Sequence, residues 1–236
     1  MKFKKYLGFI SVSLIIISSV AFSSWKNSQR EIGGLEVVFF DDQHDFLNVE
    51  MVNKLLIQNQ ELMSIGLKDT LALSSIEAEL EAYPVILNAE VYSSPSRVLT
   101  VSIQERVPLV RIAGEEAYYI DYEAVKIPLS DHFTPHVPLF FGTLSKEQTE
   151  QLVRFMQNVN KDDFLKREIV QIEAEGTDFS FKIRSHDFVV EWGSMNGFNE
   201  KVQKLKTLCK YLETLEEAPD FARINLKYNQ QVIASS

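Results

Sequence analysis

The stretch LSSIEAELEAYPVILNAEV (residues 73–91), followed by LTVSIQERVPLV (residues 99–110), decides the fold of the first half of this chain. Proline disfavours helical backbone in the residue before it, so Pro84 marks the end of a helix and the start of extended chain. The apolar residues before the proline recur at intervals of three and four positions, at Leu73, Ile76, Leu80 and Tyr83. This spacing predicts an amphipathic helix.

Two strands are expected after the proline, over residues 85–93 and 97–107. The second alternates apolar Leu99, Val101 and Ile103 with polar Thr100, Ser102 and Gln104. This alternation predicts one buried face and one wet face.

Upstream, LEVVFF (residues 35–40) is rich in strand-forming residues, and Asn48 can cap a helix that carries Val52, Leu55 and Leu56. The predicted order is therefore β-α-α-β-β. We expect a small α+β module with its own core over residues 35–106.

The N-terminus has the composition of a membrane anchor. Three lysines lie within residues 1–5, and the 20 residues from Tyr6 to Trp25 include no charged side chain. Crossing the hydrocarbon core of a bilayer takes about 20 helical residues, and aromatic residues at both ends suit its interfaces. We expect a cytoplasmic tail at residues 1–5, a transmembrane helix at residues 6–25 and a polar linker at residues 26–34.

A cleaved signal peptide is the alternative interpretation of this segment, because Ser19, Val20 and Ala21 resemble a small-residue cleavage site. Both interpretations export the rest of the chain. The bulk of the protein is therefore expected to act outside the cytoplasm.

Residues 107–236 predict a mixed but mainly antiparallel β domain with flanking helices, so the expected fold class of the whole chain is α+β. The segment at residues 117–129 reads as strand, turn and strand. Ser145 caps a helix, with Gln148 in the capping-box position. Three strands then form an antiparallel meander, in the segments EIVQIEAEG, DFSFKIRSH and FVVEWGS, and a helix at residues 199–216 follows.

The segment ARINLKYNQQVI (residues 222–233) is expected to be one long strand. Ile224, Leu226 and Tyr228 point to one side, and Arg223, Asn225 and Lys227 point to the other. No later strand is expected to pair with its free edge. Arg223 and Lys227 can protect such an edge from aggregation, or the edge can receive a strand from a partner.

These elements resemble the FtsQ/DivIB cell-division family over nearly the whole chain. The matching positions of the family's POTRA domain are Leu73, Ile76, Glu77, Leu80, Pro84, Val85, Ala89 and Val91, then Glu105, Arg106 and Pro108. In the β domain, Asp121 matches a family Asp, whereas Ala124 stands where Gly is expected, which leaves the turn type open. The terminal apolar-Asp-apolar-Arg-Tyr pattern is matched by residues 224–228, with Asn225 and Lys227 as replacements.

The resemblance implies a non-enzymatic divisome scaffold in the bacterial inner membrane, single-pass and with its bulk in the periplasm, at the division septum. It implies FtsB- and FtsL-like partners that add a strand at the C-terminal edge, and it allows other divisome members to bind the POTRA domain. No cofactor is implied. The expected partner-binding residues are Arg223, Asn225, Lys227, Tyr228, Asn229 and Gln231.

Motifs for chemistry are absent from the sequence. It has no Gly-rich phosphate loop, no G-x-S-x-G and no H-E-x-x-H. His132 and His136 are four residues apart, the spacing at which a helix could present both rings to a metal ion. Pro135 argues against such a helix, so we expect a polar loop and no metal site. The net charge of −9 disfavours nucleic acid partners, and Cys209 sits at a helical core position.

Two alternatives remain open from the sequence. One is a POTRA-containing assembly or chaperone factor for exported proteins, and the other is an anchored enzyme with an unrecognised site. The acids of EAELEAY and LETLEEA are interpreted as solvated helix faces rather than a catalytic pair.

Overall fold

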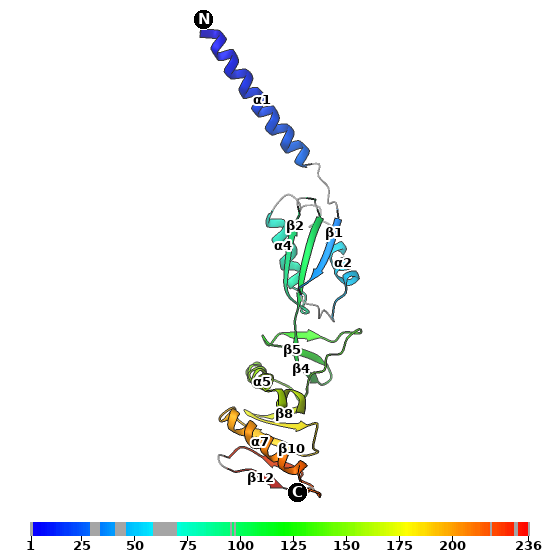
Figure 1. Ribbon diagram of the computed structural model, residues 1–236. Helices are drawn as coiled ribbons and strands as arrows, with labels where there is room; N and C mark the ends of the chain where they lie inside the picture. The colour runs from blue at the N-terminus through cyan, green and yellow to red at the C-terminus, as the bar shows by residue number, and fades with distance from the viewer. Residues whose placement is uncertain are drawn as a thin grey trace. The chain divides into compact units, whose positions relative to one another are not determined.

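The computed structural model describes residues 2–28, 34–40, 46–58, 70–94, 96, 98–217, 219–228 and 231–235. The chain divides into two compact units, one ending at Glu105 and the other beginning at Arg106. Within the described residues, the strands of the first unit form a three-stranded sheet and those of the second form a nine-stranded sheet (Figure 1). We refer to these as the small sheet and the large sheet.

Helix α1 covers Lys2–Ser28, and its apolar side chains from Ile10 to Trp25 are exposed. Within the described part of the chain, no helix combines the length and the apolar character that crossing a membrane requires. The span expected at residues 6–25 stays a prediction from the sequence.

The small sheet has the strand order β1-β3-β2, and its elements follow the order expected from the sequence. They are β1 (Gly34–Phe39), α2 (Val49–Gln58), α4 (Thr70–Glu81), β2 (Ile86–Ser93) and β3 (Val98–Glu105). Strand β1 runs parallel to β3, and β2 runs antiparallel to it.

Local signals set the helix ends of this unit. The side chain of Asn48 accepts a hydrogen bond from the Met51 N–H at 2.8 Å, which confirms the predicted cap of α2. Helix α4 ends at Glu81, before Pro84. The core joins both helices to the sheet through Val52, Leu56, Ile76, Leu80, Ile86, Ala89, Val91, Leu99, Val101 and Ile103, with Leu73 packed against it.

The polar face of β3 is less exposed to solvent than the alternation of its residues predicted. Thr100 is only 6% exposed, and Ser102 and Gln104 are half-buried. The reason is the strand order, because β3 is the central strand and is flanked by β1 and β2 on its two sides.

The large sheet has the order β12-β11-β10-β9-β8-β7-β4-β5-β6. Its first strands are β4 (Pro108–Ala113), β5 (Tyr118–Asp121), β6 (Lys126–Pro128) and β7 (Leu139–Phe141). The later strands are β8 (Ile169–Glu175), β9 (Asp178–Ile183), β10 (Val189–Gly193), β11 (Arg223–Asn225) and β12 (Ile233–Ser235). The expected meander is confirmed, since β8, β9 and β10 pair antiparallel in sequence.

Helices α5 (Lys146–Val159), α6 (Asp163–Glu168) and α7 (Phe198–Glu213) pack on this sheet. The capping box of α5 is present, with Ser145 and Gln148 bonding to each other's backbone. The core contains stacked and edge-on aromatic rings, among them Phe155, Phe179 and Trp192.

The turn between β5 and β6 adopts a strained conformation. Ala124 has a φ of 63°, the left-handed region that glycine prefers, and it is the one non-glycine residue with positive φ among the described residues. Asp121 holds the turn, because its Oδ1 accepts hydrogen bonds from the Glu123 N–H at 2.9 Å and the Val125 N–H at 2.7 Å. The backbone at Ala124 thus has the left-handed conformation that suits the Gly expected there from the resemblance, although the residue is alanine.

The prediction of one continuous strand over residues 222–233 is wrong. Strand β11 ends at Asn225, because the side chain of Asn225 accepts a hydrogen bond from the Lys227 N–H at 2.9 Å and turns the chain. The chain then returns as β12, which pairs antiparallel with β11. A later strand thus covers the edge that the sequence left open.

Candidate functional site

Strand β12 forms one edge of the large sheet. It pairs with β11 through residues 233–235, and its other side has no strand partner within the described residues. All three of its residues are exposed. Backbone N–H and C=O groups along such an edge are available to another chain.

The carboxylate of Glu191 fixes β11 against the neighbouring strand β10. Glu191 of β10 accepts hydrogen bonds from Asn225 Nδ2 at 2.7 Å and from Arg223 Nη1 at 3.1 Å. Strands β10 and β11 run parallel, with Glu191 paired to Asn225. Arg223 and Asn225, both expected to bind a partner, therefore already bond within the sheet and hold its register.

Lys227 is likewise engaged inside the unit. Its Nζ lies 3.0 Å from Asp178 Oδ2 of β9, and the hydrogen bond and charge of Asp178 raise the pKa of Lys227 above its ordinary value. Its side chain passes over Gly193, where an added Cβ would lie 2.8 Å from Lys227 Cγ. Gly193 also has a φ of +72°, so this position requires glycine for two independent reasons.

Tyr228 is the one expected site residue with a large apolar side chain. It is 53% exposed. Its backbone carbonyl accepts a hydrogen bond from Lys204 Nζ of α7 at 3.2 Å, which ties the segment after β11 to the helix. Gln231 is exposed, and Asn229 lies outside the described residues.

A hollow of about 430 Å³ lies beside the start of β12. Its walls are residues of α7 and one residue that precedes β12, namely Gln203, Lys204, Thr207, Leu208, Tyr211 and Val232. Tyr211 and Val232 are exposed apolar side chains. An added strand at β12 would therefore run next to a surface able to receive an apolar side chain.

A buried lysine supports this region, and it was missed from the sequence. Lys201 of α7 donates hydrogen bonds to the carbonyl oxygens of Trp192 at 2.8 Å and Ser194 at 2.9 Å. Burial lowers the pKa of Lys201, aided by the nearby charges of Lys204 and Lys227 and opposed by Asp178. Its helical position gave no signal, because lysine on a helix normally indicates a solvated face.

The small sheet treats its β2 edge differently. Glu77 of α4 accepts a hydrogen bond from the Val91 N–H at 2.8 Å, and Glu81 accepts one from the Ala89 N–H at 3.3 Å. The interpretation of these acids as a solvated helix face is therefore wrong for Glu77, which is half-buried, whereas Glu81 is exposed as expected and also bonds to β2. They occupy N–H groups that an added strand would need.

Groups with chemical reactivity do not converge on any of these surfaces. Burial raises the pKa of the Cys209 thiol to about 11, with Glu168 and Glu213 adding to the shift, so the thiol stays protonated and lies in the core. His132 and His136 are exposed in the loop after β6. Within the described residues, no group of three or more His, Cys, Asp or Glu side chains is placed to hold a metal ion.

The geometry defines a protein with a modest α+β unit, followed by a large mixed sheet whose last strand is an exposed edge. The family model described as "FtsQ/DivIB, C-terminal related" matches residues 107–235, more than half of the chain and nearly all of the second unit. The chain belongs to this family. No curated protein matches the chain in sequence.

Membership has functional consequences at a coarse level. The family is one of non-enzymatic cell-division scaffolds, so it indicates a role in cell division through contacts between proteins. It also implies a membrane-associated protein of the division site.

Proposed function

We propose that this chain is a divisome scaffold that binds FtsB- and FtsL-type partners by strand addition at β12. The observation that carries the proposal is the position of β12, an exposed strand at the edge of the large sheet. Main-chain hydrogen bonds along such an edge give affinity, and the apolar hollow beside Val232 gives side-chain specificity.

Residues 6–25 anchor the chain in the inner membrane in this proposal, with the N-terminus in the cytoplasm and the bulk in the periplasm. The support is the uncharged run of that length preceded by three lysines. The β-α-α-β-β unit over residues 35–106 serves as a POTRA domain. Its order of elements and its β1-β3-β2 sheet support that assignment.

The six residues expected at the site have different roles in this proposal. Tyr228 and Gln231 are exposed and contact the partner directly, and Asn229 lies between them in sequence. Arg223 and Asn225 act indirectly, because their bonds to Glu191 hold β11, the neighbour of β12, against β10. Lys227 lies at the rim with its charge paired to Asp178.

The test is a truncation of the full chain after Val232, which removes β12 and leaves β11 as the edge. A peptide from the FtsB-like partner is titrated against the parent and the truncated chain, with thermal melts alongside. We expect the truncation to lose at least 30-fold in affinity while the large-sheet unit still melts cooperatively. Unchanged or tighter binding would mean that the partner pairs with β11 or docks elsewhere.

A proline scan of Ile233, Ala234 and Ser235 tests the backbone itself. Successive N–H groups of a strand point to opposite sides, so a proline facing away from β11 removes a donor that only the partner uses. Such a variant should keep its melting temperature and lose binding. A control that changes the side chains alone, Ile233→Thr with Ala234→Ser, should bind within about threefold of the parent, because main-chain bonds are retained.

A further inference from the structure

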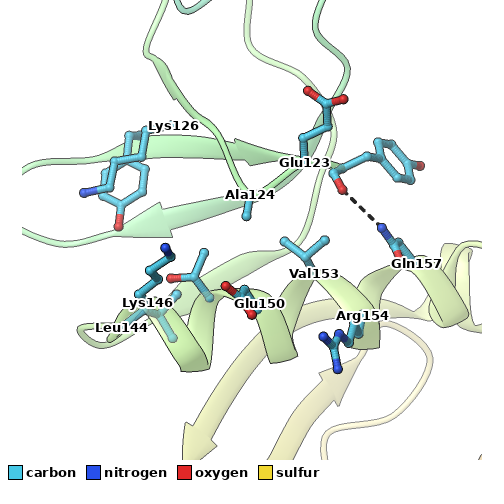
Figure 2. A pocket seen from close by; sticks show the side chains of 12 residues that line it. Glu123, Ala124, Lys126, Leu144, Lys146, Glu150, Val153, Arg154 and Gln157 are labelled. Carbon is cyan, nitrogen blue, oxygen red and sulfur yellow. Dashed lines mark hydrogen bonds between the residues drawn. The ribbon is translucent and has the colours of Figure 1, made fainter.

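A cleft lies between the β5–β6 hairpin and helix α5, at the opposite end of the strand order from β12. Its volume is about 670 Å³, within the range of sites that hold ligands. Figure 2 shows its two walls, with Ala124 and Lys126 on the hairpin and Lys146 and Val153 on the helix. Strand addition at β12 makes no use of this surface.

One end of the cleft is cationic. The Nζ of Lys126 lies 4.6 Å from the centre of the Tyr118 ring, and Lys146 from the first turn of α5 lies at the same end (Figure 2). Within the part of the chain that the structure describes, neither lysine has a carboxylate at ion-pair distance. Two exposed ammonium groups therefore lie at this end of the cleft, and that of Lys126 lies over an aromatic ring.

The acidic residues of the cleft cancel only part of this charge. Glu123 lies at the other end, where it accepts a hydrogen bond at 2.7 Å from Arg106, a guanidinium that it shares with Asp121. Glu150 follows Lys146 by one helical turn and lies between Lys146 and Val153, and Arg154 points away from the hairpin (Figure 2). A cationic end is distinctive in a chain whose net charge is −9.

The middle of the cleft is apolar. Ala124 and Val153 line it between the two lysines and Gln157, whose amide donates to the Tyr122 carbonyl at 3.1 Å, and Leu144 lies beside Lys146 (Figure 2). A small anion would contact the lysine end alone. A peptide segment with an acidic side chain next to an apolar one matches both the charged end and the apolar middle.

We propose that this cleft binds an acidic, partly apolar peptide segment of a partner protein. A carboxylate of the segment lies between Lys126 and Lys146, where it pairs with both ammonium groups. The neighbouring apolar side chain of the segment covers Ala124, Leu144 and Val153. The site is separate from β12, so the scaffold holds two partner segments at the two ends of one sheet.

The experiment uses the full chain and fluorescence anisotropy. The probe is a labelled hexapeptide of alternating leucine and aspartate, and its matched control carries asparagine in place of aspartate. We expect the aspartate peptide to bind at least tenfold tighter than the asparagine peptide. The double variant Lys126→Gln with Lys146→Gln should weaken binding at least tenfold, and both side chains are exposed, so the fold is retained.

The control variant Lys161→Gln with Lys166→Gln makes the same change in net charge at two exposed lysines outside the cleft, and it should bind like the parent. Equal weakening by both double variants would overturn the proposal, as would equal binding of the two peptides. Displacement of the peptide by inorganic phosphate at comparable concentration would reduce the cleft to a general anion site. Loss of peptide binding in the chain truncated after Val232 would place the peptide at β12 instead.

Discussion

The two sheets of this protein treat their outer strands in opposite ways. At the β2 edge of the small sheet, Glu77 and Glu81 reach from α4 and accept the N–H groups of Val91 and Ala89. At the β12 edge of the large sheet, no side chain within the described residues bonds to the strand, and all three of its residues are exposed. The β2 edge is thus closed by carboxylates from a helix, whereas the β12 edge has no such cover within the described residues.

The difference teaches where to look for partner binding. An open edge is an aggregation hazard unless it is short or occupied by a partner. Strand β12 is both exposed and only three residues long, which limits the hazard while leaving a template for a partner. Closing β2 directs strand addition away from that edge of the small sheet.

The largest effect is expected from Ile76→Ala, which breaks the small sheet alone. Ile76 is buried between α4 and the sheet, so the cavity should lower the free energy of unfolding of that unit by about 2–5 kcal/mol. Amide hydrogen exchange in β2 and β3 measures the loss, and partner affinity at β12 should not change. A change in unfolding free energy below about 0.5 kcal/mol would contradict the assignment of Ile76 to the core.

The next effect is on the open edge, through Tyr228→Ala. Tyr228 is exposed and outside the core, so its removal should leave the fold intact and weaken partner binding by about 2 kcal/mol, roughly 30-fold. Calorimetric titration with the FtsB-like peptide measures the loss of affinity. Tyr211→Ala is measured alongside for comparison, because Tyr211 is a second exposed tyrosine, on the α7 wall of the neighbouring hollow. Binding of the Tyr228 variant at parental affinity would move the contact away from the segment that follows β11.

Opening the closed edge should have a smaller effect. Glu77→Ala leaves the Val91 N–H without its acceptor, and we expect a loss of about 1–2 kcal/mol in the free energy of unfolding. The exposed strand should also let the chain self-associate. Sedimentation velocity detects this as a sedimentation coefficient that increases with protein concentration. Glu79→Ala is the matched control, because Glu79 lies on the same helix and the structure gives it no such bond to β2. If both variants behave alike, the carboxylate is not what closes the edge.

Lys227→Ala should have the smallest effect. The ion pair of Lys227 with Asp178 is partly exposed, and such pairs contribute about 0–1 kcal/mol to stability. We expect partner affinity to change less than threefold, mainly because the association rate changes. Added salt should make this difference smaller still. A loss of tenfold or more would show that Lys227 contacts the partner directly rather than bordering the site.

Elements with strong local signals were predictable from the sequence. The capping box at Ser145 and Gln148, the end of a helix before Pro84 and the three-strand meander all depend on residues close together in the chain. Helical and strand periodicity fixes such elements without knowledge of the rest of the fold. The core position of Cys209 was predictable for the same reason.

The candidate site was only half predictable, because its details depend on contacts distant in sequence. The side chain of Asn225 competes with strand backbone and ends β11, although the alternation alone favours a longer strand. The bonds of Glu191 to Arg223 and Asn225 follow from the parallel pairing of β10 with β11, which no local pattern encodes. The role of Glu77 also required the structure, since an acid on a helix usually indicates solvent.

The parallel pairing of β10 with β11 has a consequence for the time at which the edge forms. A parallel pair needs a crossover, and here α7 provides it, so we expect β11 to pair with β10 after α7 has docked on the sheet. Strand β12 has β11 as its neighbour in the sheet and is therefore added later still. Chains with an unfinished large sheet would not yet present the edge, so a partner that binds at β12, as we propose, would select copies that have completed folding.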